Sequence, residues 1–226
     1  MHGKEAGYMK SIHTVNVSIV VAADQHNPTI LHPSFLRSEG IVPKDWEVSE
    51  GPICTPAFSL VGFSNGISFR VEQSRLQVIH THPSGRGTDS PVRELARRYV
   101  EKLPHVRYTA VGVNFVTLSE CANPDEFMAN KFLKEGPWKD ENLMPISVGV
   151  HLSYAVSPAT VHLSLKPGRS KTQKGEDPKT GIVIEGNCHS ETQNTGATLS
   201  AIDSFKRALG RAYKICATVL EWNGEE

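Results

Sequence analysis

The same order of predicted elements occurs twice along the chain, and this repetition constrains the fold more than any other feature. Each half reads as a strand of alternating apolar residues, a short helix, a hairpin, a further strand and a long amphipathic helix. In the first half these elements are expected at residues 13–23, 35–40, 57–73, 75–82 and 90–104. In the second half they are expected at residues 108–118, 124–136, 146–165, 181–187 and 199–220.

Local signals support two of these elements. Asn65-Gly66 lies between two alternating segments, and Asn-Gly is the strongest short signal for a hairpin because both central residues need positive φ. Ser90 and Pro91 fit the first turn of the helix that follows, and Pro104 ends it.

A short sequence similarity links the two halves. In each half, Asn-Pro precedes a Phe-Leu-basic segment that ends in Glu-Gly, and a tryptophan, Trp46 or Trp138, follows. Such self-similarity is typical of an internal duplication. We therefore predict an α+β protein in which two similar β-α-β-β-β-α halves form one curved antiparallel sheet with helices packed on one face. The predicted organisation is a tail at 1–12, a first repeat at 13–104, and a second repeat at 105–226 with a flexible polar loop at 166–181.

This order of elements is similar to the saddle-shaped repeat of the TATA-binding protein. Together with Arg107-Tyr108 leading into residues 111–115, it also resembles a sporadically distributed family of uncharacterised prokaryotic proteins. The resemblance implies a fold only. It carries no catalytic residue over, and a saddle fold does not by itself imply DNA binding.

Charge and composition narrow the classes of function. The chain has 24 Lys plus Arg against 24 Asp plus Glu, so no net charge recruits a nucleic acid or an anionic membrane. Its longest apolar run, 19–23, is far too short to span a bilayer. The four cysteines form no CxxC pair, and residues 1–11 lack the apolar run of a signal peptide. We therefore expect a cytoplasmic protein with no membrane partner.

The most specific chemical motif is His80-Thr81-His82-Pro83, which Ser84-Gly85 and later Ser90 follow. It is similar to the His-x-His-Pro…Ser-x-x-Asp signature of the JAMM zinc hydrolases and to the form of that signature in RadC-type proteins. The resemblance implies that His80 and His82 hold a zinc ion, which activates a water molecule by lowering its pKa.

The third zinc ligand of that signature falls on Arg93, a cation that cannot bind zinc. A hydrolase would therefore need Asp89 or Glu94 in its place. A simpler metal site is a second hypothesis, because the predicted duplication puts His189 at the equivalent end of the second half, where it could meet His80 and His82. Without such a site no cofactor is predicted.

Alternation along the strands predicts a broad polar sheet surface on the side away from the helices. The segments 151–153 and 162–164 both read His-Leu-Ser, similar to a motif of the two-histidine phosphoesterases, but both lie in one hairpin rather than one in each half. We expect polar alternation here instead of a base and an acid on either side of a phosphate. The ligand-binding residues predicted on this surface are His151, His162, Arg70 and Asn114.

The sequence favours a non-catalytic binding or assembly module, with a protein partner or self-association as a dimer. Two alternatives remain: a divergent JAMM-like zinc hydrolase, and a regulatory nucleic-acid-binding protein that uses the loop between Lys166 and Lys179. The polar surface favours neither bases nor phosphates, because aromatic and basic residues are scarce on it.

Overall fold

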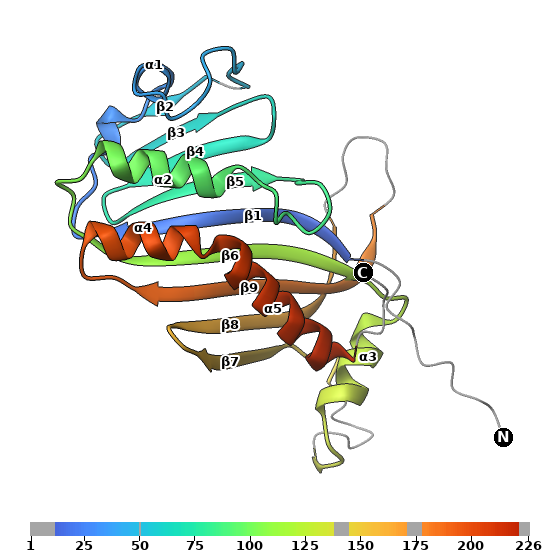
Figure 1. Cartoon of the computed structure of the whole chain (residues 1–226). Helices are drawn as coiled ribbons and strands as arrows, with labels where there is room; N and C mark the ends of the chain where they lie inside the picture. Colours follow the sequence, from blue (N-terminus) through green and yellow to red (C-terminus); the bar gives the residue numbers. More distant parts are fainter. Residues whose placement is uncertain (1–11, 50, 138–144, 171–177, 222–226) are drawn as a thin grey trace.

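The computed structural model of the chain describes residues 12–49, 51–137, 145–170 and 178–221. A nine-stranded antiparallel sheet runs through this part of the chain, in the order β2-β3-β4-β5-β1-β6-β9-β8-β7 (Figure 1). The sheet is open, with β2 and β7 at its edges. The strands are β1 (Ile12–Ala23), β2 (Ile53–Cys54), β3 (Phe58–Gly62), β4 (Ile67–Glu72), β5 (Arg75–Thr81), β6 (Tyr108–Glu120), β7 (Val150–Val156), β8 (Ala159–Arg169) and β9 (Thr180–Glu191).

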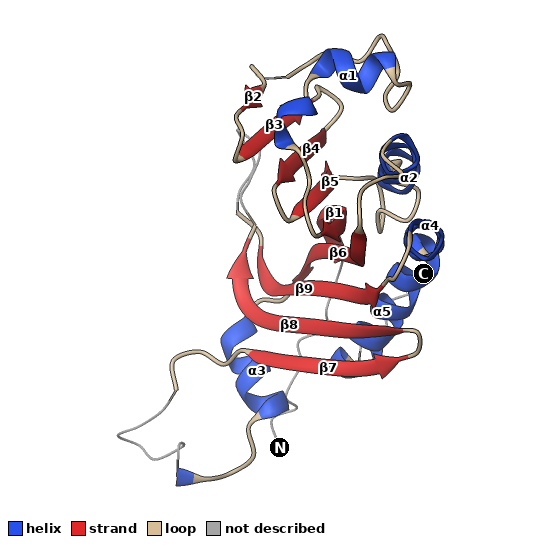
Figure 2. Cartoon of the chain, turned by 90° about the vertical axis from the view of Figure 1, so that its left-hand side faces the viewer, coloured by secondary structure: helices blue, strands red, loops and turns tan. Residues whose placement is uncertain are grey.

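Three helices lie along one face of this twisted sheet: α2 (Val92–Lys102), α4 (Thr195–Asp203) and α5 (Phe205–Leu220) (Figure 2). The face opposite these three helices is called the outer face below. Two further helices, α1 (Pro33–Ser38) and α3 (Pro124–Phe132), lie nearer the ends of the sheet (Figure 1). A 3-10 turn, η1 (Pro28–Ile30), precedes α1 in the chain. Within the described residues, no helix combines the length and the apolar character that crossing a membrane requires.

The hydrophobic core lies between these helices and the middle strands. Val17, Ile19 and Val21 of β1 are fully buried, while the residues between them point to the outer face. Tyr99 of α2 and Phe205 of α5 are fully buried in the same core. Burying one such large apolar side chain stabilises the fold by about 1.5–3 kcal/mol relative to leaving it exposed. The alternation that predicted the strands therefore also decides which side chains remain for the outer face.

The α+β class, the antiparallel sheet and the helices on one face are confirmed. The prediction of one helix over 199–220 is wrong, because α4 begins at Thr195 and Ser204 separates it from α5. The Ser204 hydroxyl donates to the Ala201 carbonyl at 2.8 Å, a local bond that competes with the helical pattern. Asn194 moves the start of α4 upstream, since its side chain accepts a hydrogen bond from the Ala197 N–H at 2.8 Å.

The prediction of a flexible loop over 166–181 is also wrong at both ends. Lys166 to Arg169 continue β8 and pair with Val183 to Thr180 of β9. Pro167 is tolerated there because β7 pairs with β8 only as far as Leu165, so on that side of the segment no strand among the described residues needs its N–H group. Residues 171–177 of the predicted loop, the tail 1–11 and Trp138 lie outside the described residues.

A glycine in β9 makes room for an aromatic residue of β6. Gly186 lies directly opposite Phe115, and a Cβ atom at residue 186 would overlap the Phe115 ring. The same ring packs against Tyr213 of α5, with ring centroids 4.8 Å apart. Phe115 therefore fills the space that Gly186 leaves and connects the sheet to the helix above it.

We expect Gly186→Ala to lower the free energy of unfolding by about 2–3 kcal/mol or more, because the methyl group would displace the Phe115 ring. Urea denaturation followed by circular dichroism measures the change. Gly210→Ala is the matched control: nothing lies near its Cβ position in α5, so it should stabilise the protein by about 0.5–1 kcal/mol. Equal stability of Gly186→Ala and wild type would contradict the packing described here.

The buried His26 should make the stability of the protein depend on pH. It is 2% exposed, and its Nε2 lies 3.1 Å from the Val21 carbonyl oxygen. Burial lowers the pKa of His26 below its ordinary value of 6.5, and the bond to Val21 offsets this only in part. The unfolded chain therefore binds a proton more readily than the folded chain. The stability that His26 contributes is complete above pH 6.5 and is lost as the pH falls below that value.

We expect the free energy of unfolding to fall as the pH is lowered from about 7.5 to 5.5, by at most about 1.4 kcal/mol per pH unit for one such group. In His26→Leu this dependence should be shallower, whatever the absolute stability of the variant. Urea denaturation at several pH values measures both slopes. Identical slopes for the two proteins would show that His26 is not responsible.

Candidate functional site

Polar side chains form a continuous row across the outer face. The register places Asn114 of β6 opposite Ser18 of β1 and Asn187 of β9. Asn187 in turn lies opposite His162 of β8, which lies opposite Ser153 of β7. We call these five residues the polar row. It arises because each strand directs alternate side chains outward and the strands pair without a shift at this level.

Hydrogen bonds join neighbours within the polar row. The Asn187 Nδ2 donates to Asn114 Oδ1 at 2.5 Å, and the Ser153 hydroxyl lies 2.8 Å from His162 Nδ1. Gly112, beside Asn114, leaves space for the first pair, since a Cβ there would lie 3.0 Å from Asn187 Nδ2. The row is therefore an ordered set of amide, hydroxyl and imidazole groups.

One end of the polar row lies in a hollow of about 410 Å³ on the outer face, between β6 and β7. His151 lies opposite Ser164 there, next to the Ser153–His162 pair, so each His-Leu-Ser segment sets its histidine opposite the other's serine. The hollow has one carboxylate, Glu185, which forms an ion pair with Lys166 at 2.7 Å. We call this hollow the polar hollow; its polar side chains are Asn114, His151, Ser153, His162, Ser164, Glu185 and Asn187.

Three of the four predicted ligand-binding residues, His151, His162 and Asn114, line the polar hollow. Arg70 does not. It lies on β4 in the other half of the sheet, where its guanidinium lies over the Phe58 ring at 4.9 Å and forms an ion pair with Glu72 at 2.7 Å. The guanidiniums of Arg75 and Arg70 lower the pKa of the Glu72 carboxyl. Arg70 is therefore part of a separate charged cluster.

The His80–His82 segment lies at the end of β5, where the chain enters the connection to α2. His80 points to the helix side of the sheet, and its Nδ1 lies 2.9 Å from the Ser90 hydroxyl oxygen. That oxygen also accepts a hydrogen bond from the Val92 N–H at 3.4 Å. Ser90 therefore caps α2, although Pro91 and not Ser90 occupies the N-cap position. Burial lowers the pKa of His80, which favours the neutral imidazole. These contacts are those of a structural histidine.

The two acidic residues considered as third zinc ligands have other partners. Asp89 accepts from the Lys206 ammonium at 2.7 Å, and Glu94 accepts from Arg98 one helical turn away at 2.9 Å. Arg98 and Lys206 lie on α2 and α5 respectively. Both carboxylates thus take part in exposed ion pairs: Asp89 joins the connection before α2 to α5, and Glu94 pairs along α2.

The structure does not bring His80, His82 and His189 together. His80 lies opposite Val17 and shares its helix-covered face, whereas His189 lies opposite Gly112 and points to the outer face, with β1 and β6 between β5 and β9. Among the described residues, no three His, Cys, Asp or Glu side chains are grouped closely enough to hold a metal ion. The predicted site of His80, His82 and His189 is therefore not formed, because His80 and His189 point to opposite faces of the sheet.

We expect zinc titration of the dialysed protein to reveal no stoichiometric site that depends on His82, because no further ligands converge on it in the described residues. Calorimetric titration of wild type, His82→Ala and the exposed control His105→Ala measures this. Stoichiometric binding that His82→Ala alone removes would contradict the expectation and restore the zinc-hydrolase hypothesis.

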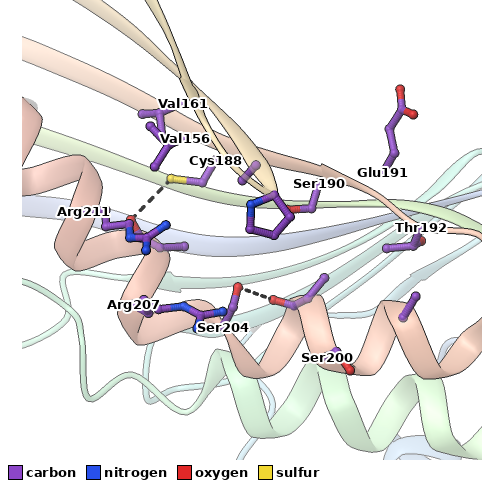
Figure 3. A pocket seen from close by; sticks show the side chains of 15 residues that line it. Val156, Val161, Cys188, Ser190, Glu191, Thr192, Ser200, Ser204, Arg207 and Arg211 are labelled. Carbon is purple, nitrogen blue, oxygen red and sulfur yellow. Dashed lines mark hydrogen bonds between the residues drawn. The ribbon is translucent and has the colours of Figure 1, made fainter.

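A second hollow, of about 300 Å³, lies on the helix side of the sheet between β8, β9, α4 and α5 (Figure 3), and the sequence did not predict it. Arg207 and Arg211 line it from α5. Their spacing of four residues, on a helix without any Asp or Glu, was the signal available in the sequence. Glu185 and Asn187 were not predicted as site residues either, although their outward direction follows from the alternation along β9.

No model of a known protein family matches the chain, and no curated protein sequence matches it.

Proposed function

We propose that the chain is a non-catalytic binding module that holds an extended segment of a partner protein along β7 and over the polar hollow. One observation carries this proposal: β7 is an edge strand that contains no Lys, Arg, Asp, Glu or Pro, and it borders the polar hollow. Natural proteins usually protect a sheet edge with charged residues or proline. An edge without such protection is suited to pairing with another strand.

Pairing with β7 would give affinity through main-chain hydrogen bonds and specificity through side chains. Alternate side chains of the added strand would lie on the outer face, next to His151 and Ser153. Beyond them, Asn114 and Asn187 offer amide groups that both donate and accept, as a peptide group does. The polar hollow thus matches neutral hydrogen-bonding groups of a protein segment.

The charge of the polar hollow disfavours a nucleic acid. Its carboxylate, Glu185, would repel phosphate groups, and the nearby Lys166 is already paired with that carboxylate. Binding to single strands relies on a basic groove with aromatic stacking platforms. The residues that line the hollow include no Lys or Arg, and their one aromatic residue, Phe115, is fully buried with its ring against Tyr213.

We expect peptides selected from a random 12-residue library to bind wild type and to lose about tenfold in affinity on Asn187→Ala or Ser153→Ala. Loss of one well-formed hydrogen bond corresponds to about 1.4 kcal/mol, or a factor of ten. Fluorescence polarisation measures the affinities. The matched control is Ser68→Ala, which removes an outward-facing serine of β4 in the other half of the sheet.

Peptides that bind all four proteins equally would place the binding surface elsewhere and would end the proposal. The same variants should be tested with single-stranded oligonucleotides at low salt. Oligonucleotide binding that Asn187→Ala weakens would replace the protein partner with a nucleic acid.

We also propose that the two halves of the chain descend from one repeat, in keeping with the resemblance to the saddle fold. This proposal is supported by the strand order, which from the centre outward is β1, β5, β4, β3 and β2 on one side and β6, β9, β8 and β7 on the other. The first four strands on each side correspond, and the two-residue strand β2 has no counterpart among the described residues. A helix follows the last strand of each half, α2 in the first and α4 in the second.

A further inference from the structure

The helix-side hollow lies on the opposite face of the sheet from the polar hollow and has a different chemistry. Its floor is formed by Val156, Val161 and Cys188 of the sheet, and its wall by α4 and α5 (Figure 3). Short side chains, Ala201 and Ala208 among them, face it from the two helices, so the space between helix and sheet remains open. A cavity of about 300 Å³ corresponds to roughly ten water molecules in liquid volume.

Two cations stand at the α5 side of this hollow without a counter-charge. In the described part of the chain, neither Arg207 nor Arg211 has an ion-pair or hydrogen-bond partner. Asp203, one turn before Arg207, forms its ion pair with Arg97 of α2 instead. Like charges four residues apart destabilise a helix. An anion between the two guanidiniums would relieve this repulsion.

The other polar groups of the hollow add few donors. The Ser200 and Ser204 hydroxyls donate to the carbonyls of Gly196 and Ala201, at 3.0 and 2.8 Å. The Cys188 thiol contacts the Ala208 carbonyl at 3.5 Å, and burial raises its pKa to about 11, so it carries no charge at neutral pH. Glu191 lies at the far end of the hollow and points away from the arginines (Figure 3). The guanidiniums are therefore its strong donors.

We propose that the helix-side hollow binds a small free carboxylate with an apolar chain, with the carboxylate between Arg207 and Arg211 and the chain on Val156, Val161 and Cys188. Arginine binds carboxylates through two parallel hydrogen bonds, so two guanidiniums satisfy both oxygens. A phosphate has more oxygens and more charge than a carboxylate, and the Ser200 and Ser204 hydroxyls beside the arginines already donate to main-chain carbonyls. The apolar floor matches an alkyl chain and does not match a second charge.

Octanoate, with about ten non-hydrogen atoms, is the probe suited to this volume, and calorimetric titration of the full chain is the measurement. We expect octanoate to bind wild type at least about tenfold more tightly than octanol, which lacks the charge, or than inorganic phosphate, which lacks the chain. Arg207→Gln and Arg211→Gln should each weaken octanoate by about tenfold. Ala201→Leu, which fills the hollow, should weaken octanoate and octanol alike.

Lys214→Gln is the matched control, because it removes a cation from the exposed side of α5 outside the hollow. It should leave the affinity for octanoate unchanged. Equal weakening by Lys214→Gln and Arg211→Gln would overturn the proposal in favour of unspecific attraction to a basic helix. Absence of octanoate binding to wild type at millimolar concentration would also overturn it. So would tighter binding of an acetylated peptide ending in leucine, since the occupant would then be a protein terminus.

Discussion

The pairing of β1 with β6 is the interaction on which the rest of the structure depends. These two strands meet at the centre of the sheet, from Ile12 opposite Ser119 to Ala23 opposite Tyr108. Each then carries a series of strands outward, so the ladder between them joins the two halves of the chain. α2 packs against β1, and α4 and α5 pack against β6, so the helices are positioned by the same ladder. Both hollows lie in the half that begins at β6.

Much of the fold could be predicted because its strands bury one face. Alternation such as Val17-Ile19-Val21 states directly which side chains enter the core. The helix break at Ser204 could not be found this way, because the apolar stripe continues across it from Ile202 to Phe205 and Leu209. The extension of β8 was missed because Pro167 argues against a strand, and only the missing neighbour beyond Leu165 makes it acceptable.

The candidate site could be predicted only in part, because the sequence of a strand shows to which face of the sheet each side chain points. His151, His162 and Asn114 all line the polar hollow because each lies between core residues of its own strand and so points to the outer face. Arg70 also faces outward, but its distance from β8 depends on the strand order, which no local pattern encodes. His80 shares the inward positions of β5 with Leu76 and Val78, whereas His189 falls between the inward positions of β9, so the sequence indicates opposite faces for the two histidines once both strands are recognised.

The two faces of one half of the sheet carry complementary kinds of chemistry. The outer face offers amides, hydroxyls and imidazoles, and the helix side offers, over an apolar floor, two guanidiniums that have no partner in the part of the chain that the structure describes. β8 contributes to both through alternate residues, since His162 faces one hollow and Val161 the other. A ligand on the helix side and a partner on the outer face would thus contact the same strand from opposite sides.

The Phe115–Gly186 contact fixes the register of β9 against β6. If β9 slid by two residues along β6, the ring of Phe115 would face Ile184 or Cys188, whose side chains would occupy the space that the glycine leaves. A slide by one residue would turn Asn187 and Glu185 into the core. This contact therefore determines which side chains reach the outer face. Substitutions of those outward-facing side chains can change the polarity of the hollow over a wide range without altering the alignment of the strands that form it.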